Sequence, residues 1–167
     1  FAITVSSGTA TVSQANTMAA FSTSGAITAS ISNTDIADLD DLSTSSADQL
    51  TIPVASTSAT AAQLTTVAGA TGLNVTATAV ETVTGTATQM DALLAVEGSS
   101  GDKVNLDADY AITINSGTAT VTQANAYATA AGVVTATISD TNIATLDDLT
   151  TASTDQLTIT VASASVT

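Results

Sequence analysis

The sequence predicts a repeat solenoid with parallel β-strands, specifically an α/β solenoid whose layers of about 23 residues each hold a strand and a short helix. Three observations predict it. Block 25–56 recurs at 132–163 with 22 of 32 residues identical, alternating apolar and hydroxyl residues recur at a regular spacing, and a helix-capping motif separates several of these segments. A right-handed parallel β-helix is the alternative, because the Thr and Val content of the helical segments also favours strands.

Seven candidate strands follow one another along the chain. They begin near Ile3, Ile27, Leu50, Leu73, Ile112, Val134 and Leu157. In each strand, aliphatic residues alternate with polar ones, as in ITASI at 27–31. A period of two with one apolar face is typical of a half-buried strand. Right-handed crossovers would stack these strands into one parallel sheet, with the helices along the other side.

Four helices are predicted by Thr-x-x-Gln, the spacing of a capping box at a helix N-terminus. The pairs are Thr11/Gln14, Thr60/Gln63, Thr86/Gln89 and Thr120/Gln123. Two short helices or 3₁₀ turns are expected at 36–42 and 143–149, where apolar residues recur every third position. Four glycines follow helical segments and are expected to be C-terminal caps, namely Gly25, Gly72, Gly98 and Gly132.

The predicted layers form one continuous array with an irregular middle. Residues 1–83 make a first group of layers, 84–111 an irregular layer with an acidic insertion, and 112–167 a second group that repeats 3–56. The irregular part is either one layer with an insertion or two imperfect layers with a poor strand at 103–106. Because neither end carries a polar capping layer, we expect that repeats continue beyond both ends or that identical subunits join end to end.

Composition argues against several function classes. The 15 acidic residues face a single basic residue, Lys103, so nucleic acid is not an expected partner. No apolar run is long enough for a membrane span. His and Cys are absent, and no enzyme is expected. The carboxylate pairs at 40–41 and 147–148 would suit glycosidase chemistry, but their recurrence with the repeat indicates a structural position.

The candidate metal site is the acidic segment GDKVNLDAD at 101–109. Asp102, Asn105, Asp107 and Asp109 place hard oxygen ligands at short spacings, which suits calcium. The segment lacks the central Gly and the terminal Glu of an EF-hand loop. A solvated acidic loop is the alternative.

Outward-facing threonines form a second candidate surface. The Thr-x-Thr pattern is complete at Thr76/Thr78, Thr135/Thr137 and Thr158/Thr160, and it is broken at Thr28/Ser30 and Thr51/Pro53. Stacked threonines of this kind resemble the ice-binding face of Thr-rich ice-binding solenoids. The alternative is that outward strand positions simply favour Thr.

Three segments, GTATVSQAN, GVVTATISDTNIATLDDL and DQLTITV, resemble the Ala/Thr/Asp-rich repeats of large secreted surface or filament proteins of bacteria, cyanobacteria especially. The resemblance implies an extracellular or cell-surface location and carries over no catalytic residues. The expected function is structural: a repeat subunit or segment of an extracellular filament, surface layer or adhesin stalk that stacks on itself. A binding module is the alternative, either a calcium-dependent adhesin, for which surface glycans would be partners, or an ice-binding solenoid.

Overall fold

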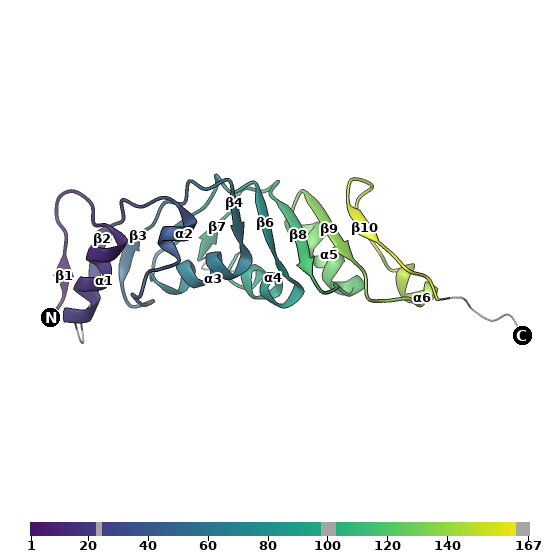
Figure 1. Ribbon diagram of the computed structural model, residues 1–167, viewed down its shortest axis with the longest axis horizontal. Coiled ribbons are helices and arrows are strands. Elements are labelled where there is room, and N and C mark those ends of the chain that lie inside the picture. Colours follow the sequence, from purple (N-terminus) through teal and green to yellow (C-terminus); the bar gives the residue numbers. More distant parts are fainter. Residues whose placement is uncertain (23–24, 98–102, 163–167) are drawn as a thin grey trace, which may run out of the picture.

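The computed structural model describes residues 1–22, 25–97 and 103–162, and it is an α/β protein in which strands and helices alternate. The molecule is elongated, and the chain runs from β1 at one end to β10 at the other (Figure 1). The strands are β1 (Ile3–Thr4), β2 (Ile27–Ser30), β3 (Gln49–Thr51), β4 (Ser58–Thr60), β5 (Val75–Thr76), β6 (Thr82–Thr86), β7 (Val104–Asn105), β8 (Ala111–Ser116), β9 (Val133–Thr137) and β10 (Gln156–Thr158). The helices are α1 (Val12–Phe21), α2 (Ile36–Leu39), α3 (Ala61–Gly69), α4 (Ala87–Leu94), α5 (Val121–Ala130) and α6 (Ile143–Leu146). In the described part of the chain, every helix is too short or too polar to cross a membrane.

The ten strands form parallel sheets. One sheet has the order β1-β2-β3, a second β10-β9-β8-β6-β4, and a third holds β5 and β7. Every pairing between these strands is parallel. A single bridge between Pro53 and Thr76 joins the first sheet to the third. The expected parallel pairing is therefore confirmed, but the strands divide among three sheets and do not form the single sheet that was expected.

The division into sheets arises in the middle of the molecule, where each helix is preceded by two strands. Between β3 and β8 the chain alternates between two sheets. Strands β4, β6 and β8 belong to the five-stranded sheet, and β5 and β7, which lie between them in the sequence, form the two-stranded sheet. The expectation of one strand per layer missed β4 and β6, because their inward residues are only Ala59, Val83 and Gly85. Strand β7 lies inside the segment 103–106, where the interpretation with two imperfect layers placed a poor strand.

The fourth expected strand begins later than predicted. Leu73 was expected to face inward, but its side chain is 37% exposed and the strand is Val75–Thr76. Thr71 takes the inner position instead. Its hydroxyl donates to Leu50 O at 2.9 Å and accepts from Leu50 N at 2.9 Å, which extends the contact between two successive layers.

The four predicted capping boxes are all present. In α1, α3, α4 and α5 the Thr hydroxyl accepts from the Gln backbone amide, and the Gln side chain accepts from the Thr backbone amide. The helices bury small apolar residues at three- and four-residue steps, as α3 does with Ala61, Leu64, Val67 and Ala68. The two short helices were also predicted correctly, and they are capped by the side chains of Asp35 and Asn142.

The glycines that follow the helices have a different role from the one predicted. Positive φ angles among the described glycines occur at Gly8 and Gly117, in the turns before α1 and α5, and not after the helices. A Cβ at Gly25 would lie 2.1 Å from Phe1 O, and a Cβ at Gly132 would lie 2.6 Å from Asp109 O. These positions lack side chains because the backbone of the preceding layer passes too close. Gly98 lies outside the described residues.

Candidate functional site

Asn16 and Asn125 occupy equivalent positions in the two copies of the repeat and connect adjacent layers. The Asn16 side chain donates to Asp41 O and accepts from Ser43 N, both at 2.8 Å. Asn125 makes the same two bonds, also at 2.8 Å, to Asp148 O and Thr150 N. One amide thus satisfies two backbone groups of the turn that follows the next short helix.

Asp48 and Asp155 form a second duplicated connection. One oxygen of the Asp48 carboxylate accepts from Ile27 N in the preceding layer at 2.8 Å, and the other accepts from Ser45 N at 2.8 Å. Asp155 bonds the equivalent amides of Val134 and Ala152 at 2.7 Å. Asp48 is buried and both of its carboxylate oxygens accept hydrogen bonds. The hydrogen bonds between successive layers explain why an Asp occurs at this position in both copies of the repeat.

The paired carboxylates lie on turns, as expected. Asp40 and Asp41 follow α2, and Asp147 and Asp148 follow α6. Three of these four side chains are exposed and Asp40 is half-buried. At Asp41 and Asp148 the asparagine side chain donates to the backbone carbonyl and not to the carboxylate.

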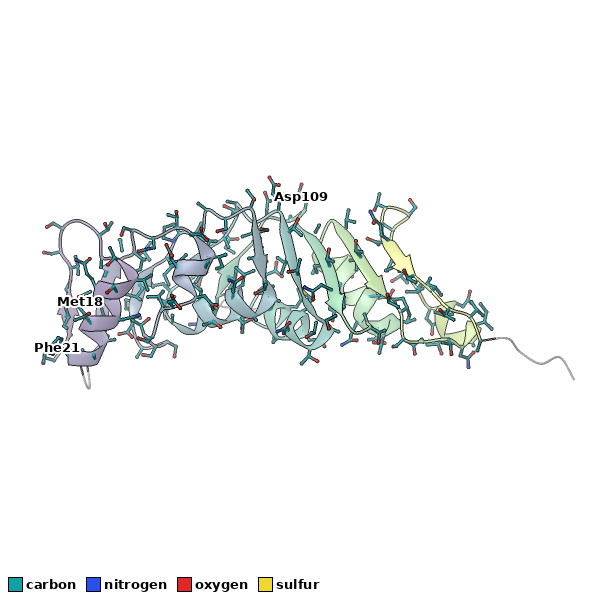
Figure 2. All side chains as sticks on the ribbon, viewed as in Figure 1. Met18, Phe21 and Asp109 are labelled. Atoms are coloured by element: carbon teal, nitrogen blue, oxygen red, sulfur yellow. The ribbon has the colours of Figure 1, made fainter. Side chains whose placement is uncertain are left out.

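The acidic segment does not form a compact ligand set among the described residues. Asn105, on β7, and Asp107 border a hollow that also includes Glu97, while Asp107 and Asp109 border another with Glu81. All three predicted ligands are exposed, Asp107 accepts from the Ala108 amide at 2.8 Å, and Asp109 lies at the rim of the molecule (Figure 2). Asp102 lies outside the described residues. Within the residues that the structure describes, no cluster of three or more His, Cys, Asp or Glu side chains could hold a metal ion.

Two buried tyrosines connect the central layers, a role that their sequence context did not indicate. The Tyr110 hydroxyl donates to Glu97 Oε2 at 3.0 Å. The Tyr127 hydroxyl lies 2.8 Å from Asp91 Oδ1 and 2.9 Å from Ala87 O, both on or beside α4. Burial, reinforced by the Glu97 carboxylate, raises the pKa of Tyr110 well above its usual value. Burial and the hydrogen bond to Asp91 raise the pKa of Tyr127 in the same way.

Comparison of the chain with family models, curated proteins and solved structures finds no match.

The N-terminal end of the molecule exposes an apolar face, which we call the N-face. It consists of Phe1 and Val5 beside β1 and of Met18 and Phe21 on α1. Figure 2 shows Met18 and Phe21 at this end of the molecule. Phe1 is 75% exposed and Phe21 68%. A hollow of about 400 Å³ lies between the strand and the helix, with Val5 and Met18 in its lining.

The C-terminal end exposes a second apolar face, which we call the C-face. It consists of Ile143 on α6 and of Ile159 and Val161 after β10, with exposures of 64%, 43% and 53%. Apart from Leu73, the large apolar side chains that are exposed in the described residues belong to the N-face or the C-face. Exposed apolar groups of this kind mark contact surfaces more often than isolated ones do.

One outer column of the five-stranded sheet consists of threonines in register. Thr60 pairs with Thr84, Thr84 with Thr113, and Thr113 with Thr135. The next position of the column, on β10, is Gln156. The predicted array is divided, because Thr76 lies in the two-stranded sheet, where its partner is Asn105.

Proposed function

We propose that the chain is a structural repeat unit of an extracellular bacterial filament, surface layer or adhesin stalk, and that its layers form a continuous α/β solenoid that stacks end to end. The proposal is supported by the different exposure of equivalent residues in the two copies of the repeat. The two copies of the repeat have identical or similar residues at equivalent positions, and one copy is covered by neighbouring layers where the other lies at an end of the described structure.

The C-face supplies the clearest comparison. Ile36, Ile52 and Val54 of the first copy are 5%, 1% and 5% exposed, because β5 and α3 follow them. The equivalent residues of the second copy are those of the C-face, and at least 43% of each side chain is exposed. The same side chains are thus core in one copy and surface in the other, because among the described residues no layer lies over Ile143, Ile159 and Val161.

The N-face supplies the reverse comparison. Tyr110 and Tyr127 of the second copy are 1% and 0% exposed, because the layer of β6 and α4 precedes them. Their equivalents in the first copy are Phe1, which is 75% exposed, and Met18, which is only half-buried. Covering both ends by further layers would place these residues in the environment that their counterparts already have.

The remaining observations favour a passive role. The duplicated polar residues, namely Asn16, Asn125, Asp48 and Asp155, are used in bonds between layers. The formal net charge of −14 would keep filaments apart laterally while the apolar ends join.

Electron microscopy of the purified 167-residue chain, together with sedimentation velocity over a range of concentrations, tests the proposal. We expect rods or fibres whose length increases with concentration and whose width stays that of one molecule. Monomers at every concentration, with the end-layer amides as protected from hydrogen exchange as the central ones, would contradict it.

The threonine column favours a second candidate, a binding module with an ordered array of hydroxyl groups such as an ice-binding surface. The hydroxyls of Thr84, Thr113 and Thr135 repeat at about 4.8 Å along the column, the spacing of paired strands, while the hydroxyl of Thr60 caps α3. If this surface binds ice, the chain shows thermal hysteresis, and Thr113→Tyr abolishes it while Thr76→Tyr, in the other sheet, does not. Absence of hysteresis in the unmodified chain removes this candidate.

A calcium-dependent adhesin is the other form of this alternative, and it depends on the predicted ligands Asp107 and Asp109. A rise in melting temperature on addition of calcium, lost in Asp107→Ala, would support it. An unchanged melting temperature would remove it. A glycan array with and without calcium would then test for surface glycans as partners.

A further inference from the structure

Resting on the proposed function, we infer that the chain joins head to tail, with the N-face of one copy packed on the C-face of a second copy. The joint would place strand on strand and helix on helix, in the same sense as the joints between layers inside the molecule. The association would then be heterologous and open, so it would extend into a filament and would not close as a dimer.

The joint inside the molecule between β6–α4 and β8–α5 shows how a face of the N-face type is covered. Strand β8 pairs with β6 in parallel over five positions, from Ala111 with Thr82 to Ser116 with Thr86. Helix α5 packs beside α4 through Tyr127, whose hydroxyl reaches Asp91. A strand and a helix of the preceding layer therefore cover the face together.

The C-face offers the same two kinds of element. Its helical residue, Ile143, lies on α6, and its strand residues, Ile159 and Val161, directly follow β10. The N-face likewise has Met18 and Phe21 on a helix and Phe1 and Val5 beside a strand. Among the described residues, β1 pairs only with β2 and β10 only with β9, so each leaves one edge open.

The chemistry of the N-face also suits an apolar partner. At the internal joint the tyrosine hydroxyls of residues 110 and 127 meet carboxylates on the preceding layer. At the N-face these positions hold Phe1 and Met18, which have no hydroxyl to satisfy. The hollow beside Met18 is lined by Val5 and Ala10 and also by the polar residues Thr9, Ser13, Gln14 and Thr17. A partner surface made of Ile and Val side chains fits Phe1 and Met18, because neither side chain needs a hydrogen bond when it is covered.

Strand direction favours the head-to-tail arrangement over a symmetric one. Every strand pair among the described residues is parallel. A head-to-tail joint continues that pattern from β10 of one copy to β1 of the next. Two N-faces related by a two-fold axis, with strand on strand and helix on helix, would instead place β1 antiparallel to its own copy.

Two variants test the inference, each with a charge at the centre of one face. Phe21→Glu alters the N-face and Ile143→Glu alters the C-face, and both side chains are more than 60% exposed, so the fold of the single chain is retained. Leu73→Glu is the matched control, since Leu73 is an exposed apolar residue away from both ends. Circular dichroism of each variant checks that the fold is unchanged.

Sedimentation velocity of each variant alone and of the equimolar mixture gives the result. The head-to-tail joint predicts that each variant alone is a monomer, that the mixture forms dimers and nothing larger, and that Leu73→Glu polymerises like the unmodified chain. Dimers in Phe21→Glu alone or in Ile143→Glu alone would show a symmetric joint and overturn the inference, while the proposed function would stand. A failure of the unmodified chain to associate would contradict the proposed function itself.

Discussion

Ile36 and Ile143 are the same residue at the same position of the two repeats, and truncation of each to Ala measures how much the neighbouring layer contributes. Ile36 is 5% exposed and Ile143 is 64% exposed. Ile→Ala removes three carbon groups, which corresponds to about 2.4 kcal/mol for a buried side chain, and the cavity left behind adds to this. We expect Ile36→Ala to lower the free energy of unfolding by about 3 kcal/mol. Ile143→Ala should lower it by less than about 1 kcal/mol, because only about a third of that side chain is covered.

Denaturant unfolding followed by far-UV circular dichroism, at concentrations where the chain is monomeric, measures both values. Both residues begin a four-residue helix, so the change in helix propensity cancels in the comparison. Leu39→Ala and Leu146→Ala are the controls: these two side chains are 0% and 7% exposed, and both variants should lose at least about 2 kcal/mol. Equal losses for the two isoleucine variants in the monomer would refute the reasoning, since Ile143 would then have a cover that the structure does not show.

Three further predictions concern the contacts between layers. Asn16→Ala removes two hydrogen bonds to backbone groups of the next layer, and we expect the free energy of unfolding to fall by about 2 kcal/mol. Hydrogen exchange in the turn after α2 should also become faster. An unchanged exchange rate would argue against a stabilising contact between Asn16 and this turn. Gly72→Ala should lower the midpoint of thermal unfolding, because the new Cβ would lie 2.8 Å from the backbone oxygen of Ser46 in the preceding layer. Gly69→Ala is the matched comparison. It has open space around the new Cβ and should raise the midpoint by a few degrees. The folded-state pKa values of Tyr110 and Tyr127 lie above the unfolded value of about 10. The contribution of these two tyrosines to the free energy of unfolding should therefore be constant below pH 10 and fall by about 1.4 kcal/mol per pH unit for each tyrosine above it. In Tyr110→Phe this fall should be half as steep, and an unaltered slope would mean that Tyr110 ionises in the folded state.

Local structure was predictable from the sequence where the determining residues are close together in the chain. The capping boxes at Thr11, Thr60, Thr86 and Thr120 formed as the Thr-x-x-Gln spacing predicts, because both hydrogen bonds lie within one helical turn. The alternation in ITASI at 27–31 likewise predicted which side chains of β2 are buried.

The sheet to which a strand belongs could not be predicted in this way. Strands β4 and β6 are defined by pairing with residues 24 positions apart, and their few small inward residues give a weak alternating pattern. The glycines at 25 and 132 were assigned to helix caps because they follow helices, but the backbone of the preceding layer determines them. The carboxylate partners of the buried tyrosines also come from a different layer, so their positions in the sequence gave no sign of the contact.

The sequence by itself determined that the chain contains a repeat and that its units are strands and short capped helices. The tertiary structure alone decided how the strands divide among three sheets, which polar residues join the layers, and which apolar residues are left exposed at the two ends. The physical reason is that exposure is not a property of a residue type. Ile36 and Ile143 have nearly the same sequence around them and differ only in whether another layer covers them.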